Sequence, residues 1–340
     1  MTFMTRKMVA AIERAGRLMQ PPGLRSFGRM MKGLRRAQMR LLDGLAEAPK
    51  PARDPRLPDG ARFLTRSHRT AAGQRAYRLY LPASQPVRPK GLILMLHGCN
   101  QTAEDFARGT RMNAEAEKHG LAVVYPVQTS AHNAAQCWNW FAPGDQARGG
   151  GEPAELASLM RKLTKDFGLK RHRVFVAGLS AGGAMAAILA DVYPDVFAAA
   201  GVHSGLARGA ASDMWSALAA MRGDGGAGEP PRAAGTPEHP VRRIVFQGDA
   251  DETVHVSNAD RIVTLALGEA PPPARVTKRS VRGRSYVRSD YLAPDGTVQL
   301  QLWLVKGGGH AWSGGSPAGS FTDPKGPDAT ALMVRFFLAE

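Results

Sequence analysis

The 340-residue sequence has only two cysteines and no apolar run long enough to cross a bilayer. A membrane-spanning helix needs about 20 mostly apolar residues, so none is predicted. Cys99 and Cys137 are too far apart for a C-x-x-C redox or zinc motif. No segment resembles a nucleic-acid-reading module, and no base-stacking platform is repeated along a basic stripe, so nucleic acid is not an expected partner. The basic start lacks the apolar core of a secretory signal, which favours a cytoplasmic location, with granule association as an option.

Basic residues are in excess, and much of the excess lies at the amino terminus. The formal net charge is +16, and residues 1–58, with 13 Lys or Arg and 4 Asp or Glu, carry +9 of it. Residues 1–47 have the pattern of two amphipathic helices with one basic face. Such helices can bind an anionic granule or membrane surface; packing on the catalytic domain or a loosely ordered tail are the alternatives. We therefore expect a basic extension and linker over residues 1–58.

Apolar strands alternate with helical segments over residues 59–340. This alternation predicts an α/β domain with a mostly parallel sheet covered by helices on both faces. A hairpin is expected around the turn at residues 294–296, and residues 223–240 read as a Gly/Pro/Ala-rich loop. The expected strands are 76–81, 91–96, 121–125, 174–177, 198–202, 243–248, 284–292 and 298–305, and the expected helices are 103–119, 155–167, 185–189 and 328–338.

Ser180 stands between an apolar strand and a helical segment, in Gly178-Leu179-Ser180-Ala181-Gly182. This G-x-S-x-G pattern is typical of the nucleophile elbow of an α/β-hydrolase fold, in which a sharp turn exposes the serine. A side chain two residues either side of the serine would clash with the neighbouring strand or helix. We therefore expect Ser180 to be the nucleophile of a triad.

The triad acid and base should follow the serine in that order, each just past a strand. Asp251 follows the strand that ends at Gly248, and the G-x-x-D-x-x-V pattern common there favours it over Asp249 and Glu252. The alternative is that all three acids are solvated turn residues that cap the next helix.

His310 follows an apolar strand and three glycines, which let the backbone turn back over the sheet. A histidine suits the role of general base because its ordinary pKa lies near neutrality. His203 also follows a strand and is the second candidate.

The oxyanion hole requires two backbone N–H groups near the serine. Ala181, directly after the nucleophile, is expected to supply one. The other is expected from Cys99, in the loop after the strand at residues 91–96, with Asn100 as a weaker candidate. His97 in this loop is expected to brace it by hydrogen bonding rather than to transfer protons.

Several motifs, taken together, resemble the polyhydroxybutyrate (PHB) depolymerase family of esterases, which is related to feruloyl and acetylxylan esterases. The likeness covers about residues 70–340. It implies an α/β-hydrolase domain with Ser180, Asp251 and His310 as triad, and a disulfide between Cys99 and Cys137. The matching stretches are Leu96-His97-Gly98-Cys99, Gln101-Thr102, Cys137-Trp138-Asn139-Trp140, Ala177 to Gly183, Val202-His203-Ser204-Gly205, the Asp251 turn, and Gly309-His310-Ala311-Trp312-Ser313-Gly314-Gly315.

The implied disulfide conflicts with a cytoplasmic location, where thiols stay reduced and two buried thiols would be expected instead. The resemblance and the paired cysteines favour the extracellular alternative. Trp138, Trp140 and Trp312 flank the expected site, and they either form an apolar substrate wall or pack in the core.

The expected activity is hydrolysis of carboxylic esters through an acyl-serine, without metal or cofactor. Poly- or oligo(3-hydroxybutyrate) is the first substrate class implied by the resemblance, and small or carbohydrate-linked esters are the alternative. Peptide cleavage, acyl transfer, and a granule-coating role without catalysis are further alternatives.

Overall fold

The computed structural model describes residues 54–339 apart from residues 56, 71–72 and 225–239. The chain divides into two units, Met1–Ala48 and Pro49–Glu340, and all described residues lie in the second. The expected amphipathic helices, most of the linker and most of the loop at 223–240 thus lie outside the described residues. The boundary placed at residue 58 stays a prediction.

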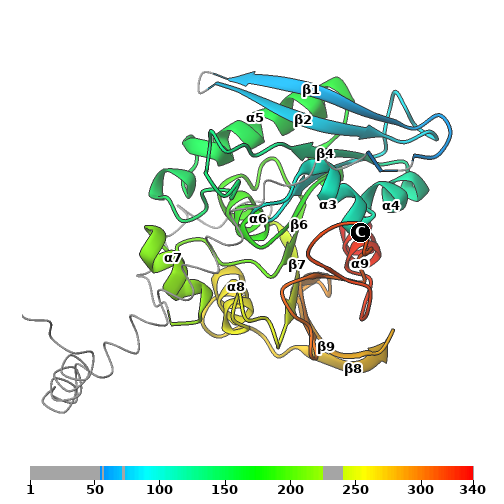
Figure 1. The fold of residues 1–340 in the computed structure, drawn as a ribbon. Coiled ribbons are helices and arrows are strands. Elements are labelled where there is room, and N and C mark those ends of the chain that lie inside the picture. Colours follow the sequence, from blue (N-terminus) through cyan, green and yellow to red (C-terminus); the bar gives the residue numbers. More distant parts are fainter. Residues whose placement is uncertain (1–53, 56, 71–72, 225–239, 340) are drawn as a thin grey trace, which may run out of the picture. The chain divides into compact units, whose positions relative to one another are not determined.

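A mostly parallel sheet forms the centre of the domain, in the order β1-β2-β4-β3-β5-β6-β7-β10-β9-β8 (Figure 1). The strands from β4 to β10 in this order run parallel, and antiparallel strands flank them at both edges. The fold class is therefore confirmed as α/β. The strands are β1 (Arg62–Thr70), β2 (Gly73–Leu81), β3 (Leu92–Leu96), β4 (Ala122–Pro126), β5 (Val174–Leu179), β6 (Ala199–His203), β7 (Arg242–Gly248), β8 (Arg275–Val281), β9 (Arg284–Leu292) and β10 (Val298–Val305).

Helices cover both faces of this sheet. One face packs against α5 (Gly151–Asp166), α6 (Ala181–Val192), α7 (Met214–Met221) and α8 (Ser257–Leu267). The other packs against α3 (Ala103–Thr110), α4 (Met112–His119) and α9 (Ala329–Leu338). None of the described helices is long and apolar enough to cross a membrane. Short 3-10 turns at Pro143–Asp145 and Arg171–Arg173, and the small pair β11 (Trp312–Ser313) and β12 (Thr322–Asp323), complete the described elements.

Strand β3 shows why the central strands are continuous apolar runs. Leu92, Leu94 and Leu96 belong to the core on the α5–α6 side. Ile93 and Met95 belong to the core on the α3–α9 side. Because both faces of a parallel strand are covered, each position must be apolar, and full burial of such a side chain is worth about 1.5–3 kcal/mol.

The helix expected over residues 103–119 is two helices, which is a correction to the prediction. Arg111 has a left-handed backbone, with φ of 57°, and it ends α3 and begins α4. Its guanidinium donates to the Gly314 carbonyl at 2.6 Å and pairs with Asp328 at 3.0 Å. Gly109 lies two residues before this break, but a single glycine is tolerated within a helical pattern, so the sequence did not predict the break.

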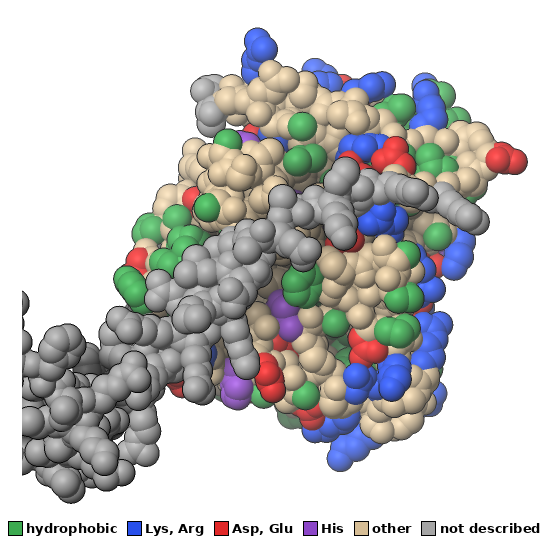
Figure 2. All heavy atoms as spheres, in the orientation of Figure 1, with side chains coloured by type: hydrophobic (Ala, Val, Ile, Leu, Met, Phe, Trp, Pro, Cys, Tyr) green, Lys and Arg blue, Asp and Glu red, His purple; other side chains and the backbone are tan. Residues whose placement is uncertain are grey.

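The hairpin of β9 and β10 is confirmed, but β8 beside it was not predicted. Its side chains are exposed except at Thr277, so it lacks the apolar alternation that marks a half-buried strand. Figure 2 shows Lys and Arg side chains along the margin where β8 and β9 lie in Figure 1. Charged side chains on an edge strand hinder pairing with another chain.

Candidate active site

Ser180 lies at the turn between β5 and α6, as the sequence predicts. Its backbone has φ of 57° and ψ of −121°, a conformation that non-glycine residues rarely adopt. A Cβ on Gly178 would lie 2.2 Å from the Gly182 carbonyl oxygen, and one on Gly182 would lie 2.1 Å from that of Leu96. The turn therefore requires both glycines, because a side chain at either position would clash with the neighbouring backbone, as the sequence predicts. Strain of this kind persists where surrounding contacts fix the chain.

The buried Asp251 and the half-buried His310 form an acid–imidazole pair beyond the ends of β7 and β10. His310 Nδ1 lies 2.9 Å from Oδ2 and 3.1 Å from Oδ1 of Asp251. Oδ1 also accepts the N–H groups of Thr253 and Val254, at 2.9 and 2.8 Å. Burial raises the pKa of Asp251. The hydrogen bond and charge of His310, together with the two N–H donors, lower it by more, so the pKa lies below its ordinary value. Asp251 is thus held as a carboxylate that orients the ring.

The two rival acids have other places in the structure. Asp249 pairs with Lys306 at 2.9 Å and accepts the Gly307 N–H at 2.7 Å, which fixes the loop before His310. Glu252 is exposed. Of the three acids, Asp251 is the one in contact with His310.

A close approach of two glycines brings the acid loop and the histidine loop together. A Cβ on Gly248 would lie 2.1 Å from the Gly308 carbonyl oxygen. The same oxygen accepts the Ala250 N–H at 3.0 Å. The Asp251–His310 pair therefore depends on backbone contact as well as on its own hydrogen bonds.

His203, the second candidate for the base, is a buried residue with a structural role. Its ring stacks between Phe246 and Trp312, with centroids 5.6 and 5.1 Å away. Its Nε2 accepts the Ser313 N–H at 3.0 Å. Burial, and secondarily the charge of His310, lowers the pKa of His203 to about 3. A neutral ring whose acceptor nitrogen is already bonded is unsuited to take a proton from a nucleophile.

Ser180 and His310 lie at the same edge of the sheet, because β5, β6, β7 and β10 run parallel and each residue follows a carboxyl end. His203 connects them: its carbonyl accepts the Ser180 N–H at 2.9 Å, and its ring accepts that of Ser313. Among the hydrogen bonds of the described residues, none joins the Ser180 hydroxyl to the His310 ring. Such bonds are often long before substrate binds.

The loop after β3 lies against the nucleophile and is tied by a disulfide. A Cβ on Gly98 would lie 3.5 Å from Cβ of Ser180. Cys99 and Cys137 form a disulfide with a Cα–Cα distance of 4.3 Å. The pairing implied by the family resemblance is therefore confirmed, and the two-thiol alternative is not observed.

Two backbone N–H groups beside Ser180 are available for an oxyanion. Across the described part of the chain, the N–H groups of Cys99 and Ala181 have no hydrogen-bond acceptor. The N–H of Asn100 is donated to the Ala135 carbonyl at 2.9 Å, which removes it as a candidate. The two expected donors are thus compatible with an oxyanion hole, whose function stays a prediction.

The three tryptophans considered as a substrate wall are buried. Trp138, Trp140 and Trp312 are 0%, 5% and 1% exposed. The indole N–H of Trp138 donates to the His97 carbonyl at 3.1 Å, and that of Trp312 to Thr330 at 2.9 Å. These are the contacts of core residues, the alternative given above, and a substrate contact stays a prediction.

His97 braces, as expected, the loop after β3 that carries Cys99; we call residues 97–100 the oxyanion loop. Its Nδ1 lies 2.8 Å from the Gly98 carbonyl oxygen, and its Nε2 accepts the Gln128 N–H at 3.4 Å. Burial lowers the pKa of His97, so the ring is neutral.

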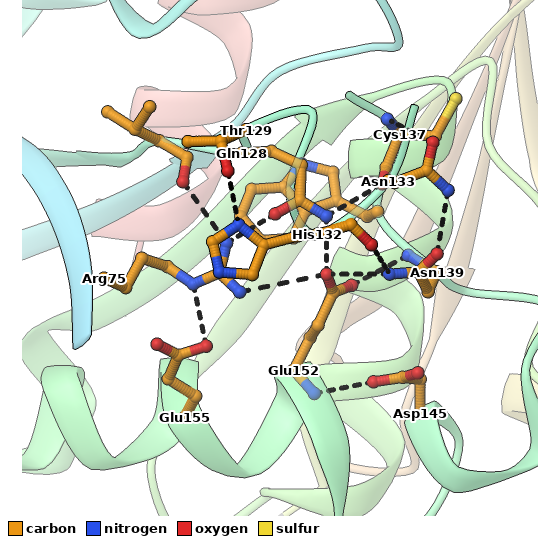
Figure 3. Close-up of polar contacts among 12 residues, drawn as sticks. Arg75, Gln128, Thr129, His132, Asn133, Cys137, Asn139, Asp145, Glu152 and Glu155 are labelled. Carbon is orange, nitrogen blue, oxygen red and sulfur yellow. Dashed lines mark hydrogen bonds and ion pairs between the residues drawn. The ribbon is translucent and has the colours of Figure 1, made fainter. Parts of the chain in front are cut away.

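Two features near the site were missed in the sequence. Phe321 is 45% exposed, has φ of 50°, and meets the His310 ring edge-on at 6.3 Å. Gln128 and Glu152 belong to a buried polar group beneath the disulfide (Figure 3). A signal existed for Gln128, which closely follows the carboxyl end of β4, where polar site residues collect in parallel sheets. Within the described residues, no group of three or more His, Cys, Asp or Glu is arranged to hold a metal ion.

A serine at a strand–helix elbow, followed by an Asp–His pair at the same edge of a parallel sheet, defines the α/β-hydrolase fold. The family model described as esterase PHB depolymerase matches residues 75–268, more than half of the chain. The chain belongs to this family.

Individual relatives agree with this membership. The poly(3-hydroxyalkanoate) depolymerase C of Paucimonas lemoignei is 30% identical over 245 residues, covering 68% of this chain and 57% of that protein. The feruloyl esterase B of Neurospora crassa is 33% identical over 129 residues, covering 38% of this chain and 43% of that protein. The chain thus spans about half the length of these curated relatives. An acetyl xylan esterase from Aspergillus awamori has the same fold, with a TM-score of 0.55 at 20% identity, covering 69% of this chain and 89% of that one.

Proposed function

We propose that the protein is a serine carboxylic ester hydrolase with Ser180, His310 and Asp251 as its triad. The observation that carries the proposal is the Asp251–His310 pair, 2.9 Å apart, at the sheet edge that also holds the Ser180 elbow. The N–H groups of Cys99 and Ala181 support it, because they lie next to the nucleophile without an internal acceptor.

The reaction proceeds by acyl transfer. His310 Nε2 takes the Ser180 proton as Oγ attacks the ester carbonyl, and Asp251 stabilises the imidazolium. The oxyanion accepts hydrogen bonds from Cys99 and Ala181, and a donor of this kind is worth about 2.7–4 kcal/mol in comparable sites. Collapse breaks the C–O bond, and the alcohol leaves with the proton from His310. Water then attacks the acyl-serine with His310 as base, which releases the acid and restores Ser180.

The first proposed substrate class is poly- or oligo(3-hydroxybutyrate). Its support is the family membership and the 30% identity to the Paucimonas lemoignei enzyme, whose name describes depolymerisation of a poly(3-hydroxyalkanoate). Hydrolysis of aromatic or carbohydrate-linked esters is the alternative, supported by the feruloyl esterase relative. Both use the same acyl-enzyme chemistry and differ in the alcohol and acyl groups that are bound.

The disulfide favours an oxidising compartment for the catalytic domain, because cytosolic thiols are kept reduced. Binding of residues 1–47 to an anionic granule or membrane surface is proposed from their basic amphipathic pattern. Deletion of residues 1–55 tests this role. An esterase keeps its activity on soluble esters after the deletion, whereas a coating protein loses its binding.

The test of function compares the wild type, Ser180→Ala and the exposed control Ser280→Ala. Short-chain nitrophenyl esters, nitroanilides and amorphous poly(3-hydroxybutyrate) are the substrates. We expect the wild type and control to cleave esters and polyester but not anilides, and Ser180→Ala to be inactive. Cleavage of small esters alone would refute the polyester assignment, and activity in Ser180→Ala would refute the triad.

A further inference from the structure

A group of polar side chains packs against the segment around Cys137, residues 133–139, which we call the disulfide loop. The group, here named the Glu152 cluster, consists of Gln128, Asn139 and Glu152, with Arg75 alongside (Figure 3). Arg75, Gln128 and Glu152 are 2%, 1% and 7% exposed. Buried polar and charged side chains are costly unless they are fully bonded. The position of this cluster next to the oxyanion loop therefore calls for an explanation.

Glu152 is the acceptor at the centre of the cluster. Its Oε2 accepts the backbone N–H of Asn139 at 2.7 Å. Its Oε1 accepts the side-chain amides of Gln128, at 2.5 Å, and Asn139, at 3.1 Å, and lies 3.8 Å from Arg75. All of these neighbours are donors, which stabilise an ionised carboxylate against the burial that raises the pKa of Glu152, and the site is unsuited to any group that must donate.

Gln128 links Glu152 to the oxyanion loop through two hydrogen bonds of its own. Its side-chain amide also donates to the Cys137 carbonyl at 2.8 Å. Its backbone N–H donates to the His97 ring at 3.4 Å. Cys137 is bonded to Cys99 by the disulfide, and His97 stands two residues before Cys99. Both connections therefore converge on Cys99, which follows Gly98, the residue that lies against Ser180.

Asn139 connects Glu152 to the backbone N–H of Cys137 by way of Asn133. Its side-chain oxygen accepts from Asn133 at 2.8 Å, and Asn133 in turn accepts the Cys137 N–H at 3.3 Å. Through Asn139 and Gln128, Glu152 thus holds both the N–H side and the carbonyl side of Cys137.

We propose that Glu152 and Gln128 are positioning residues that fix the Cys99 N–H in the oxyanion hole, an inference that rests on the proposed function. Neither side chain touches the reacting atoms. A donor displaced by about 1 Å loses much of its stabilisation of a transition state, which can cost about 100-fold in rate. The cluster should therefore affect the chemical step more than the binding of the ester.

Glu155 provides a matched control on the same helix. It is a glutamate of similar burial, 11% exposed, and it pairs with Arg75 at 2.7 Å. In Figure 3 it lies on the far side of Arg75, with no contact drawn to the disulfide loop. Glu152→Gln removes an acceptor and adds a donor among donors, whereas Glu155→Gln keeps an acceptor for Arg75.

The experiment measures kcat and KM on a nitrophenyl ester for the wild type, Glu152→Gln and Glu155→Gln, with Ser180→Ala as the inactive reference. We expect Glu152→Gln to lower kcat about 10- to 100-fold with KM changed less than about threefold, and Glu155→Gln to stay within about threefold of the wild type. The rate of Ser180 labelling by a fluorophosphonate, whose phosphoryl oxygen occupies the oxyanion hole, should fall in parallel with kcat.

Hydrogen exchange of the amides in residues 96–103 gives a readout that does not depend on activity. We expect faster exchange there in Glu152→Gln than in Glu155→Gln, with both proteins folded. If the wild type cleaves esters and Glu152→Gln keeps its kcat, the inference fails while the proposed function stands. An equal loss of kcat and melting temperature in both variants would show a purely structural role. If the wild type cleaves no ester, the function fails, and unchanged exchange in Glu152→Gln would refute the positioning as well.

Discussion

Removal of the disulfide tests how the oxyanion loop is held. The change is the double substitution Cys99→Ser with Cys137→Ser, which keeps the size of both side chains. The bond joins residues 38 positions apart. On the loop-closure model, opening a loop of that length lowers the free energy of unfolding by about 4 kcal/mol.

Other contacts between the same loops make this figure an upper value. The Asn100 N–H still donates to the Ala135 carbonyl at 2.9 Å, and Gln128 still donates to the carbonyl of residue 137 at 2.8 Å. These bonds keep the loops near each other in the folded state. We therefore expect a loss of about 2–4 kcal/mol and a fold that survives.

The effect on catalysis should be smaller than that of losing the oxyanion donor itself. The Cys99 N–H belongs to the backbone and remains after substitution, but it is held less firmly. We expect kcat on a nitrophenyl ester to fall about tenfold, against the 100-fold or more that loss of a whole donor costs. KM should change less than kcat, because the Cys99 N–H is expected to act mainly on the oxyanion of the transition state and not on the bound ester.

Urea unfolding monitored by tryptophan fluorescence measures the change in the free energy of unfolding, and steady-state kinetics measures the change in kcat and KM. Wild type treated with a reductant should approach the variant in both assays. A variant with the unfolding midpoint and kcat of the wild type would refute the reasoning, provided that thiol titration confirms the bond in the wild type.

Three further predictions concern the acid and the elbow. Asp251→Asn should lower kcat about 10³- to 10⁴-fold without unfolding the protein, and steady-state kinetics retaining more than about a tenth of the activity would contradict it. Gly182→Ala should abolish soluble folded protein, because its Cβ would lie 2.1 Å from the Leu96 carbonyl oxygen; a normal circular dichroism melt would argue against the close contact. The pKa of Asp251 is lowered in the folded state, so its contribution to stability is present above the unfolded-state pKa and is lost as pH falls through the folded value. The stability gap between wild type and Asp251→Asn in urea should therefore shrink as pH falls below about 4, and a gap independent of pH would rule out the ionic role.

The elbow and the acid–imidazole pair were predictable because each leaves a local signature. A Cβ at Gly178 or Gly182 would lie under 2.5 Å from backbone atoms, so only glycine fits at these two positions. Asp251 and His310 each follow a buried strand, and parallel strands carry such residues to one edge.

The polar cluster was not predictable because its members are far apart in sequence. Arg75, Gln128 and Glu152 come from β2, the segment after β4, and α5, and their contacts depend on how these elements pack. A glutamate at the start of a helix is an ordinary surface residue in a sequence, since acidic residues favour helix N-termini. Its burial at 7% exposure becomes visible only in the folded chain.

The choice between His203 and His310 shows what the structure adds to a motif. Both follow a strand, so position alone does not separate them. The acceptor nitrogen of His203 is already bonded to the Ser313 N–H, and its pKa of about 3 keeps the ring uncharged. His310 is bonded through Nδ1 to Asp251, and no other bond of the described residues occupies its ring. The proposed mechanism charges His310 transiently, and a second cation nearby would oppose that step. Because burial keeps His203 neutral, this residue links Ser180 to the histidine loop without repelling the imidazolium.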